Sequence, residues 1–231
     1  TKFHETLRNI IAFTTTVDIL QAKCYIAHKY NYQKPVMVPS EKSFFSIKGI
    51  RHPLIEHIQT NELYVTNDIC LGKENSSHSD KDAFNGMLLY GTNAVGKTSL
   101  IKSIGIAIIM AQAGLYVPCE SFLFSPYHSI YTRILGNDNI FKGLSTFAVE
   151  MTELRTILRM ADKNSLILGD ELCSGTESDS ALSIFTAGLE HLHETNATHL
   201  FATHFHEIQQ FAEIMALDKL CMKHMAVTYD E

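Results

Sequence analysis

Apolar residues near the N-terminus recur at intervals of three and four, which is the period of one face of an α-helix. The pattern predicts one long helix over residues 7–27, followed by a linker over residues 31–39 that contains two prolines. Such a helix can pack in a core or can act as a lever that enters from an upstream region, and the pattern fits both. The apolar positions are Leu7, Ile10, Phe13, Val17, Leu20, Cys24 and Ala27.

Beyond the linker, short apolar runs alternate with longer segments of helical period. This order is typical of an α/β domain with a central, mostly parallel sheet flanked by helices. The predicted strands are residues 44–50, 63–69, 87–90, 129–134, 165–171, 198–203 and 220–227, and the predicted helices are residues 99–112, 147–158 and 178–194.

The composition is that of an ordinary globular domain, with 45% hydrophobic and 19% charged residues. No apolar run approaches the ~20 residues that span a bilayer, and nothing resembles a signal peptide, so we expect an intracellular protein without a membrane contact. Five widely spaced cysteines without a C-x-x-C pattern favour reduced thiols over disulfides or a zinc site. A net charge of −6 argues against a DNA-binding face on this part of the chain.

Residues 91–98, GTNAVGKT, match the phosphate-loop pattern G-x-x-x-x-G-K-[ST] between a predicted strand and a predicted helix. Glycines let backbone N–H groups curve around phosphate oxygens, and the following helix N-terminus adds about half a positive charge. We expect Lys97 to reach the β- and γ-phosphates of a nucleotide, and the Thr98 hydroxyl to hold Mg²⁺. The other candidate nucleotide-binding residues are Gly91, Thr92, Asn93, Ala94, Val95, Gly96 and Ser99.

Two adjacent carboxylates, Asp170 and Glu171, end an apolar strand at the sheet edge where α/β proteins bind ligands. We expect Asp170 to complete the Mg²⁺ shell and Glu171 to orient or deprotonate the attacking water. Alone, such a pair can simply start a turn, but downstream of a phosphate loop the catalytic interpretation is favoured. His204 follows the next predicted strand, where a neutral imidazole could hydrogen-bond a γ-phosphate oxygen. Its spacing to His206 does not match a zinc site.

Three further positions each have two interpretations. Tyr64 can stack on a base or can be a half-buried strand residue. Arg51 and His52 can belong to a site or can fix a turn beside a proline. Ser145 or Thr146 can cap the next helix or can form an anion site at its N-terminus, and the residues alone favour the simple cap.

Together these motifs resemble the ATPase domain of the MutS family of DNA mismatch repair proteins, over about residues 17–227. The sequence of residues 141–178 is most similar to the divergent viral and organellar branch of that family. The motifs that carry the resemblance are RHPLIE at residues 51–56, GTNAVGK at 91–97, STFAVEMTE at 145–153, DELCSGT at 170–176 and FATH at 201–204.

The resemblance implies an ABC-type P-loop NTPase fold that binds and hydrolyses ATP with Mg²⁺. It implies a homodimer or heterodimer with two composite sites, which couples nucleotide state to a clamp on mismatched double-stranded DNA held by domains outside this chain. Residues 1–40 would be the end of a lever helix and its linker. Residues 41–231 would be the ATPase domain, without the family's C-terminal dimerisation segment. The protein would work in the cytoplasm, the nucleus, an organelle or a viral factory.

By the same matching, Lys97, Glu171 and His204 would be catalytic, with His204 as the switch histidine. Tyr64 would stack on adenine and Asn93 would help to position the phosphates. Ser145 would act in trans on the partner subunit's γ-phosphate, which overrides the preference for a simple cap.

This sequence departs from the family pattern in several places without removing a phosphate or Mg²⁺ ligand. Thr92 replaces the usual proline and Val95 a glycine, and Thr98 and Ser99 invert the usual order of serine and threonine. The segment that faces the partner subunit in the family differs here at residues 173–174, Cys-Ser, and at Glu177. Coupling between subunits is therefore the family property that the resemblance supports least.

An alternative function is a nucleotide-gated module of a transporter or of a chromosome-structuring ATPase. Those families carry a Leu-Ser-Gly-Gly signature, whereas this chain has Leu-Ser-Thr at residues 144–146. A third possibility is an assembly switch that binds nucleotide without meaningful hydrolysis. The sequence favours the repair ATPase.

Overall fold

The computed structural model describes residues 2–58, 64–73, 83–92, 95–134, 146–172 and 178–226. Its centre is a five-stranded sheet in which every pair of neighbouring strands is parallel. The strand order is β6-β7-β8-β4-β9, so strands distant in sequence lie side by side. These strands are β4 (Gly86–Tyr90), β6 (Ser129–Arg133), β7 (Ser165–Asp170), β8 (Thr198–Ala202) and β9 (Leu220–His224).

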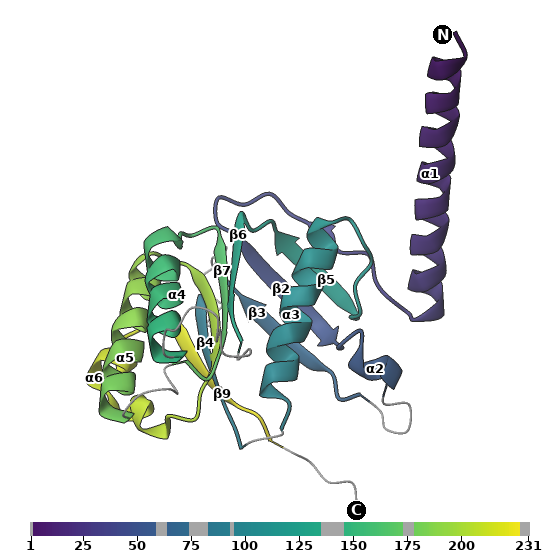
Figure 1. Cartoon of the computed structure of the whole chain (residues 1–231). Coiled ribbons are helices and arrows are strands. Elements are labelled where there is room, and N and C mark those ends of the chain that lie inside the picture. Colours follow the sequence, from purple (N-terminus) through teal and green to yellow (C-terminus); the bar gives the residue numbers. More distant parts are fainter. Residues whose placement is uncertain are drawn as a thin grey trace, which may run out of the picture.

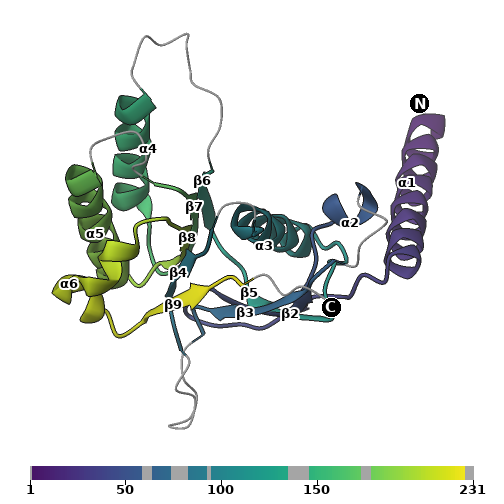
Figure 2. The ribbon, with the colours of Figure 1, turned by 90° about the horizontal axis from the view of Figure 1, so that it is seen from below.

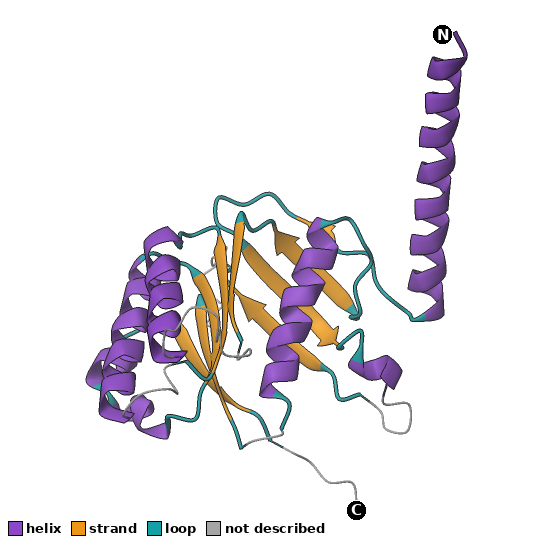
Figure 3. Ribbon diagram, viewed as in Figure 1, coloured by secondary structure: helices purple, strands orange, loops and turns teal. Residues whose placement is uncertain are grey.

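A second sheet lies beside the parallel one, in the order β1-β5-β2-β3 (Figure 3). Strand β2 is antiparallel to both β5 and β3, and the edge strand β1 is parallel to β5. The sequence pattern predicts only one central sheet, so the chain differs from the expectation by having two. The four strands are β1 (Val36–Met37), β2 (Phe44–Ile50), β3 (Asn67–Leu71) and β5 (Ser121–Ser125).

Helices cover both faces of the parallel sheet. Helix α3 (Lys97–Gln112) packs between the two sheets, whereas α4 (Thr146–Met160), α5 (Ser178–Glu194), a 3₁₀ turn over His206–Gln210 and α6 (Ala212–Met215) lie on the opposite face (Figure 2). Side chains of β4 alternate between two core clusters: Met87 and Leu89 pack with α3, and Leu88 with α5. Burial on both faces explains why these strands are continuously apolar.

Helix α1 (Lys2–Lys29) projects from the rest of the molecule, and short helix α2 (Ile55–Ile58) lies near its base (Figure 1). Large apolar side chains along α1 are exposed, among them Phe3 at 81% and Phe13 at 72%. Among the described residues, Phe3–Lys29 is the one segment long and apolar enough to cross a membrane by length and composition, with a mean hydropathy of 1.2. On that measure the expectation of no such segment is wrong.

Candidate active site at the carboxyl ends of the parallel strands

The phosphate-loop sequence connects the end of β4 to the start of α3. Gly91 and Gly96 have φ angles of +153° and +96°, which side chains rarely allow. A Cβ placed on Gly91 would lie 2.9 Å from Cγ2 of Val95 and 3.2 Å from the carbonyl oxygen of Met225. Both glycines are therefore required by the path of the loop, and the strand–loop–helix context expected from the sequence is present.

The Lys97 side chain lies within the curve of this loop and is only 5% exposed. Its Nζ donates to the carbonyl oxygens of Gly91, at 2.7 Å, and Thr92, at 2.9 Å. An ammonium group has three donors, so one more is available to a ligand. No side chain caps the N-terminus of α3 at Gly96. Because the first amides of a helix lack partners within it, this end of α3 can bind an anion.

Thr98 and Asp170 meet across the sheet edge, although they are far apart in the sequence. The Thr98 hydroxyl donates to Oδ2 of Asp170 at 2.5 Å. Oδ1 of Asp170 is buried and has no hydrogen-bond partner among the described residues. A hydroxyl beside a carboxylate with one unpaired oxygen fits Mg²⁺, which prefers oxygen ligands and takes few of them from protein. No group of three or more His, Cys, Asp or Glu that could hold a metal occurs in the described part of the chain.

Glu171 contacts His204, which follows the end of the neighbouring strand β8. His204 Nε2 hydrogen-bonds Oε1 of Glu171, and both side chains are partly exposed. The Glu171 backbone has a φ of +52°, a left-handed conformation that costs a non-glycine residue roughly 1–2 kcal/mol. Its N–H donates to the carbonyl oxygen of Ala202 at 3.0 Å, which ties this turn to β8. Strain of this kind concentrates at functional sites.

The remaining predicted site residues fall into three groups. Thr92, Val95 and Ser99 belong to the loop and the first turn of α3, beside Lys97. Tyr64 is half-buried in the segment just before β3, which belongs to the second sheet, and not within a strand as predicted. The predictions for Asn93, Ala94 and Ser145 concern residues outside those described.

The strand β9 adds a contact to the loop that sequence reasoning missed. Met225, just after β9, donates its N–H to the carbonyl oxygen of Tyr90 at 2.8 Å, so that it borders Gly91. Tyr90 in turn stacks on His206, with ring centroids 5.8 Å apart. The only sequence signal was the strand predicted over residues 220–227, and it did not indicate that this strand pairs with β4.

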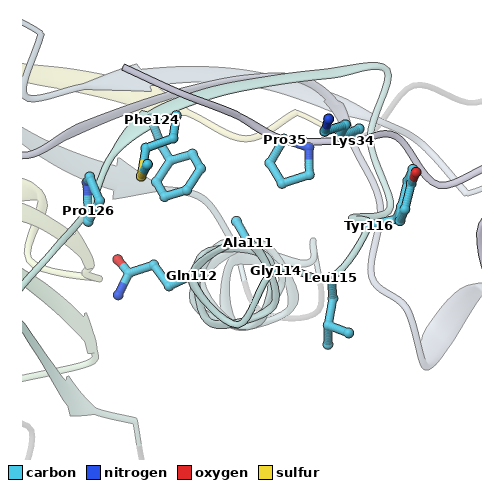
Figure 4. Close-up of a pocket in the computed structure, with 10 residues that line it drawn as sticks. Lys34, Pro35, Ala111, Gln112, Gly114, Leu115, Tyr116, Phe124 and Pro126 are labelled. Carbon is cyan, nitrogen blue, oxygen red and sulfur yellow. The ribbon is translucent and has the colours of Figure 1, made fainter. Parts of the chain in front are cut away.

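A cavity of about 460 Å³ lies at the other end of α3 (Figure 4). Ala111 and Gly114 border it from the helix end, and Pro35, Phe124 and Pro126 surround the space opposite. Since α3 has 16 residues, this cavity is about 20 Å from Lys97 along the helix. The cavity is therefore separate from the candidate site.

These features define an α/β domain whose parallel sheet and glycine loop are consistent with a phosphate-loop fold. The family model described as MutS domain V matches residues 87–231, more than half of the chain. The chain therefore belongs to the MutS family of DNA mismatch repair proteins.

Similar proteins from other organisms support the same family assignment. A DNA mismatch repair mutS homologue of Acanthamoeba polyphaga mimivirus is 39% identical over 97% of this chain and 22% of its own length. A mitochondrial DNA mismatch repair mutS homologue of Sarcophyton glaucum is 37% identical over 89% of this chain and 20% of its own length. MutS of Staphylococcus saprophyticus is 35% identical over 99% of this chain and 24% of its own length. The chain thus spans a quarter or less of these three relatives.

Proposed function

We propose that this chain binds and hydrolyses ATP with Mg²⁺, as the ABC-type ATPase domain of a mismatch-recognition protein. The observation that carries the proposal is the contact between Thr98 and Asp170 at the mouth of the glycine loop. That contact brings the two expected Mg²⁺ ligands together beside the lysine that would bind the phosphates. Membership of the MutS family favours this function over a transporter or chromosome-structuring module.

In this proposal the loop and α3 hold the triphosphate. The amides of the first turn of α3 and the free donor of Lys97 bind phosphate oxygens, so the phosphate charge meets a positive helix end. Thr98 and Asp170 would hold Mg²⁺, which when bound neutralises charge on the β- and γ-phosphates. Asn93 and Ser99 would add phosphate contacts, and Tyr64 would stack on adenine.

Glu171 is the proposed base for the attacking water. Its carboxylate follows β7 directly after Asp170, so it lies next to the proposed metal ligand. When water attacks the γ-phosphorus and the bond to the ADP oxygen breaks, Glu171 accepts the proton of the water. His204 orients Glu171 through their hydrogen bond and can exchange that contact for a γ-phosphate oxygen.

The proposed whole protein works as a homodimer or heterodimer. Ser145 of one subunit would contact the γ-phosphate bound by the other, so each site would need two chains. Mismatched double-stranded DNA would be clamped by parts of a longer protein, in an intracellular compartment. The exposed helix α1 would be the lever that connects the ATPase domain to that clamp.

Two substitutions test the site assignments. Glu171→Gln should retain ATP binding and abolish phosphate release, because the amide cannot accept the proton.

Lys97→Ala should weaken ATP binding measured by calorimetry by about tenfold or more. Glu207→Gln and Lys102→Ala, two exposed positions, are the matched controls and should behave as the unmodified chain. Retained turnover in Glu171→Gln would remove Glu171 from its role, and unchanged binding in Lys97→Ala would contradict the phosphate-loop assignment.

Turnover as a function of protein concentration separates hydrolysis from a silent nucleotide switch. If each site needs two chains, phosphate release per chain should rise with concentration before reaching a plateau. A chain fused in tandem should remove that dependence. An absence of release in the fused dimer, with ATP binding intact, would favour the switch.

A further inference from the structure

A groove opens to solvent between α4 and α5, on the opposite face of the parallel sheet from α3. The two helices lie side by side in both views (Figures 1 and 2). The groove encloses about 820 Å³, and its apolar lining includes Met151 and Leu158 from α4 and Ile184 from α5. His191 Nε2 hydrogen-bonds the carbonyl oxygen of Leu158 at 2.8 Å, which holds the helices together at one point along the groove.

Gly188 lines this groove from the interior of α5, where glycine destabilises a helix relative to alanine. Glycine is commonly retained in a helix where a neighbouring segment leaves no room for a side chain. Here a Cβ on Gly188 would meet no atom within 4 Å in the described part of the molecule. Packing within the described chain therefore gives no reason for a glycine, whereas close approach of another backbone would.

Two arginines border the same groove. Arg155 and Arg159 are one helical turn apart on α4, and both are exposed. No carboxylate among the described residues forms an ion pair with either of them, whereas Arg133 near the same helix pairs with Glu153 at 3.2 Å. In a chain of net charge −6, two unpaired arginines beside an apolar groove are a local reversal of charge.

We propose that this groove binds an acidic amphipathic helix of another protein. The apolar stripe of such a helix would lie along the groove, and a small residue would allow its backbone to approach Gly188. Aspartate or glutamate residues one turn apart would pair with Arg155 and Arg159. Apolar contact from one face and charge pairing at the edge together define the partner. Among the described residues that line the groove there is no Phe, Tyr or Trp, and the His191 ring is engaged with the Leu158 carbonyl oxygen, so the mainly apolar lining fits a protein helix better than a nucleic-acid single strand.

A phage-displayed library of 18-residue helical peptides, with all surface positions randomised, provides the probe. Selection on the folded chain should enrich peptides with an apolar stripe and at least two acidic residues one turn apart. The Kd of an enriched peptide should rise by about tenfold or more in Arg155→Glu and in Arg159→Glu. Arg8→Glu on the exposed helix α1 is the matched charge reversal outside the groove and should leave the Kd unchanged.

Gly188→Ala is a variant that we expect to be more stable than the unmodified chain, so weaker peptide binding by it could not be explained by misfolding. Alanine in a helix interior should raise the Tm by about 2–4 °C, while the added methyl group should weaken peptide binding. Failure to enrich acidic amphipathic peptides would overturn the proposal, as would binding that is unchanged in both Arg155→Glu and Gly188→Ala. Binding of a DNA oligonucleotide that depends on the two arginines, in place of peptide binding, would also overturn it.

Discussion

His199 is a histidine held without charge inside the parallel sheet. It is 1% exposed, and its Nδ1 hydrogen-bonds the carbonyl oxygen of Ala197 at 3.0 Å. Its Nε2 has no partner among the described residues. Burial lowers the pKa of His199 to about 4, the Ala197 carbonyl opposes this shift, and the charges of His193 and Lys42 add to it.

This lowered pKa predicts that acid destabilises the domain. The unfolded histidine has a pKa near 6.5, so between about pH 6.5 and 4 the unfolded chain binds more protons than the folded one. The stabilisation is complete above pH 6.5 and should decrease by about 2 kcal/mol on going to pH 5. Urea unfolding at pH 7.5 and 5 measures the change. His199→Asn, whose amide can replace the Nδ1 contact, should lower stability overall but flatten this dependence.

The exposed His128 supplies the control for that experiment. His128→Asn should leave the pH dependence as it is in the unmodified chain. An equal slope in His199→Asn and the unmodified chain would show that acid acts through other groups.

At the scale of elements, a polar joint fastens α1 to the rest of the molecule. Arg51 donates to the carbonyl oxygens of Tyr30, at 3.2 Å, and Asn31, at 2.9 Å, just beyond the C-terminus of α1. Its guanidinium also pairs with Glu56 at 3.4 Å, and the Tyr32 hydroxyl donates to the same carboxylate at 3.0 Å. A cation at these carbonyls complements the negative end of the helix. His52 Nδ1 accepts the N–H of Leu54 at 3.2 Å, so the Arg-His sequence fixes a turn and also holds the end of α1.

Arg51→Lys should loosen this joint, because a single ammonium cannot reproduce the forked contacts of a guanidinium. We expect amide hydrogen exchange in residues 26–33 to become about tenfold faster, with exchange in α3 unchanged. Arg8→Lys makes the same substitution at an exposed position of α1 and should have no such effect. Equal protection of residues 26–33 in all three proteins would show that packing, and not Arg51, holds the base of α1.

The elements differ in how well the sequence predicted them. The helix predicted over residues 178–194 has those bounds in the structure, and the strand predicted over 44–50 likewise, because each has a clear period and a clear end. Strand β1 has two residues, both exposed, so it has no hydrophobic pattern to detect. Strand β5 carries alternating buried Phe122 and Phe124 and could have been predicted. The division of the strands into two sheets was missed because the hydrophobic period does not determine which strands pair.

The features of the candidate site also differ in how well the sequence predicted them. Lys97 and Asp170 were predicted as site residues because each belongs to a short motif that directly follows an apolar strand. Their mutual placement depends on β7 and β4 flanking β8 in one sheet, which only strand order provides. The left-handed backbone of Glu171 and the contact of Met225 with the loop are local geometry that no residue pattern encodes.

For the molecule as a whole, the site connects its two cores. Helix α3 carries Lys97 and Thr98 and packs in one core cluster, whereas Leu172, just after the carboxylate pair, packs in the other. A ligand held between α3 and Asp170 would therefore bind only the fully folded molecule. Such a ligand stabilises the fold in proportion to its occupancy.

We expect MgATP to raise the Tm of the chain by about 5–10 °C at a concentration of 100 Kd, which corresponds to about 2.7 kcal/mol. Asp170→Asn should reduce the part of this rise that depends on Mg²⁺. Without nucleotide its Tm should be no lower than that of the unmodified chain, because the substitution removes a buried charge whose Oδ1 has no described partner. Calorimetric scans with ATP in Mg²⁺ or in EDTA measure both effects. The same Mg²⁺-dependent rise in Asp170→Asn would exclude Asp170 as a ligand, and a large drop in Tm without nucleotide would make it a structural residue.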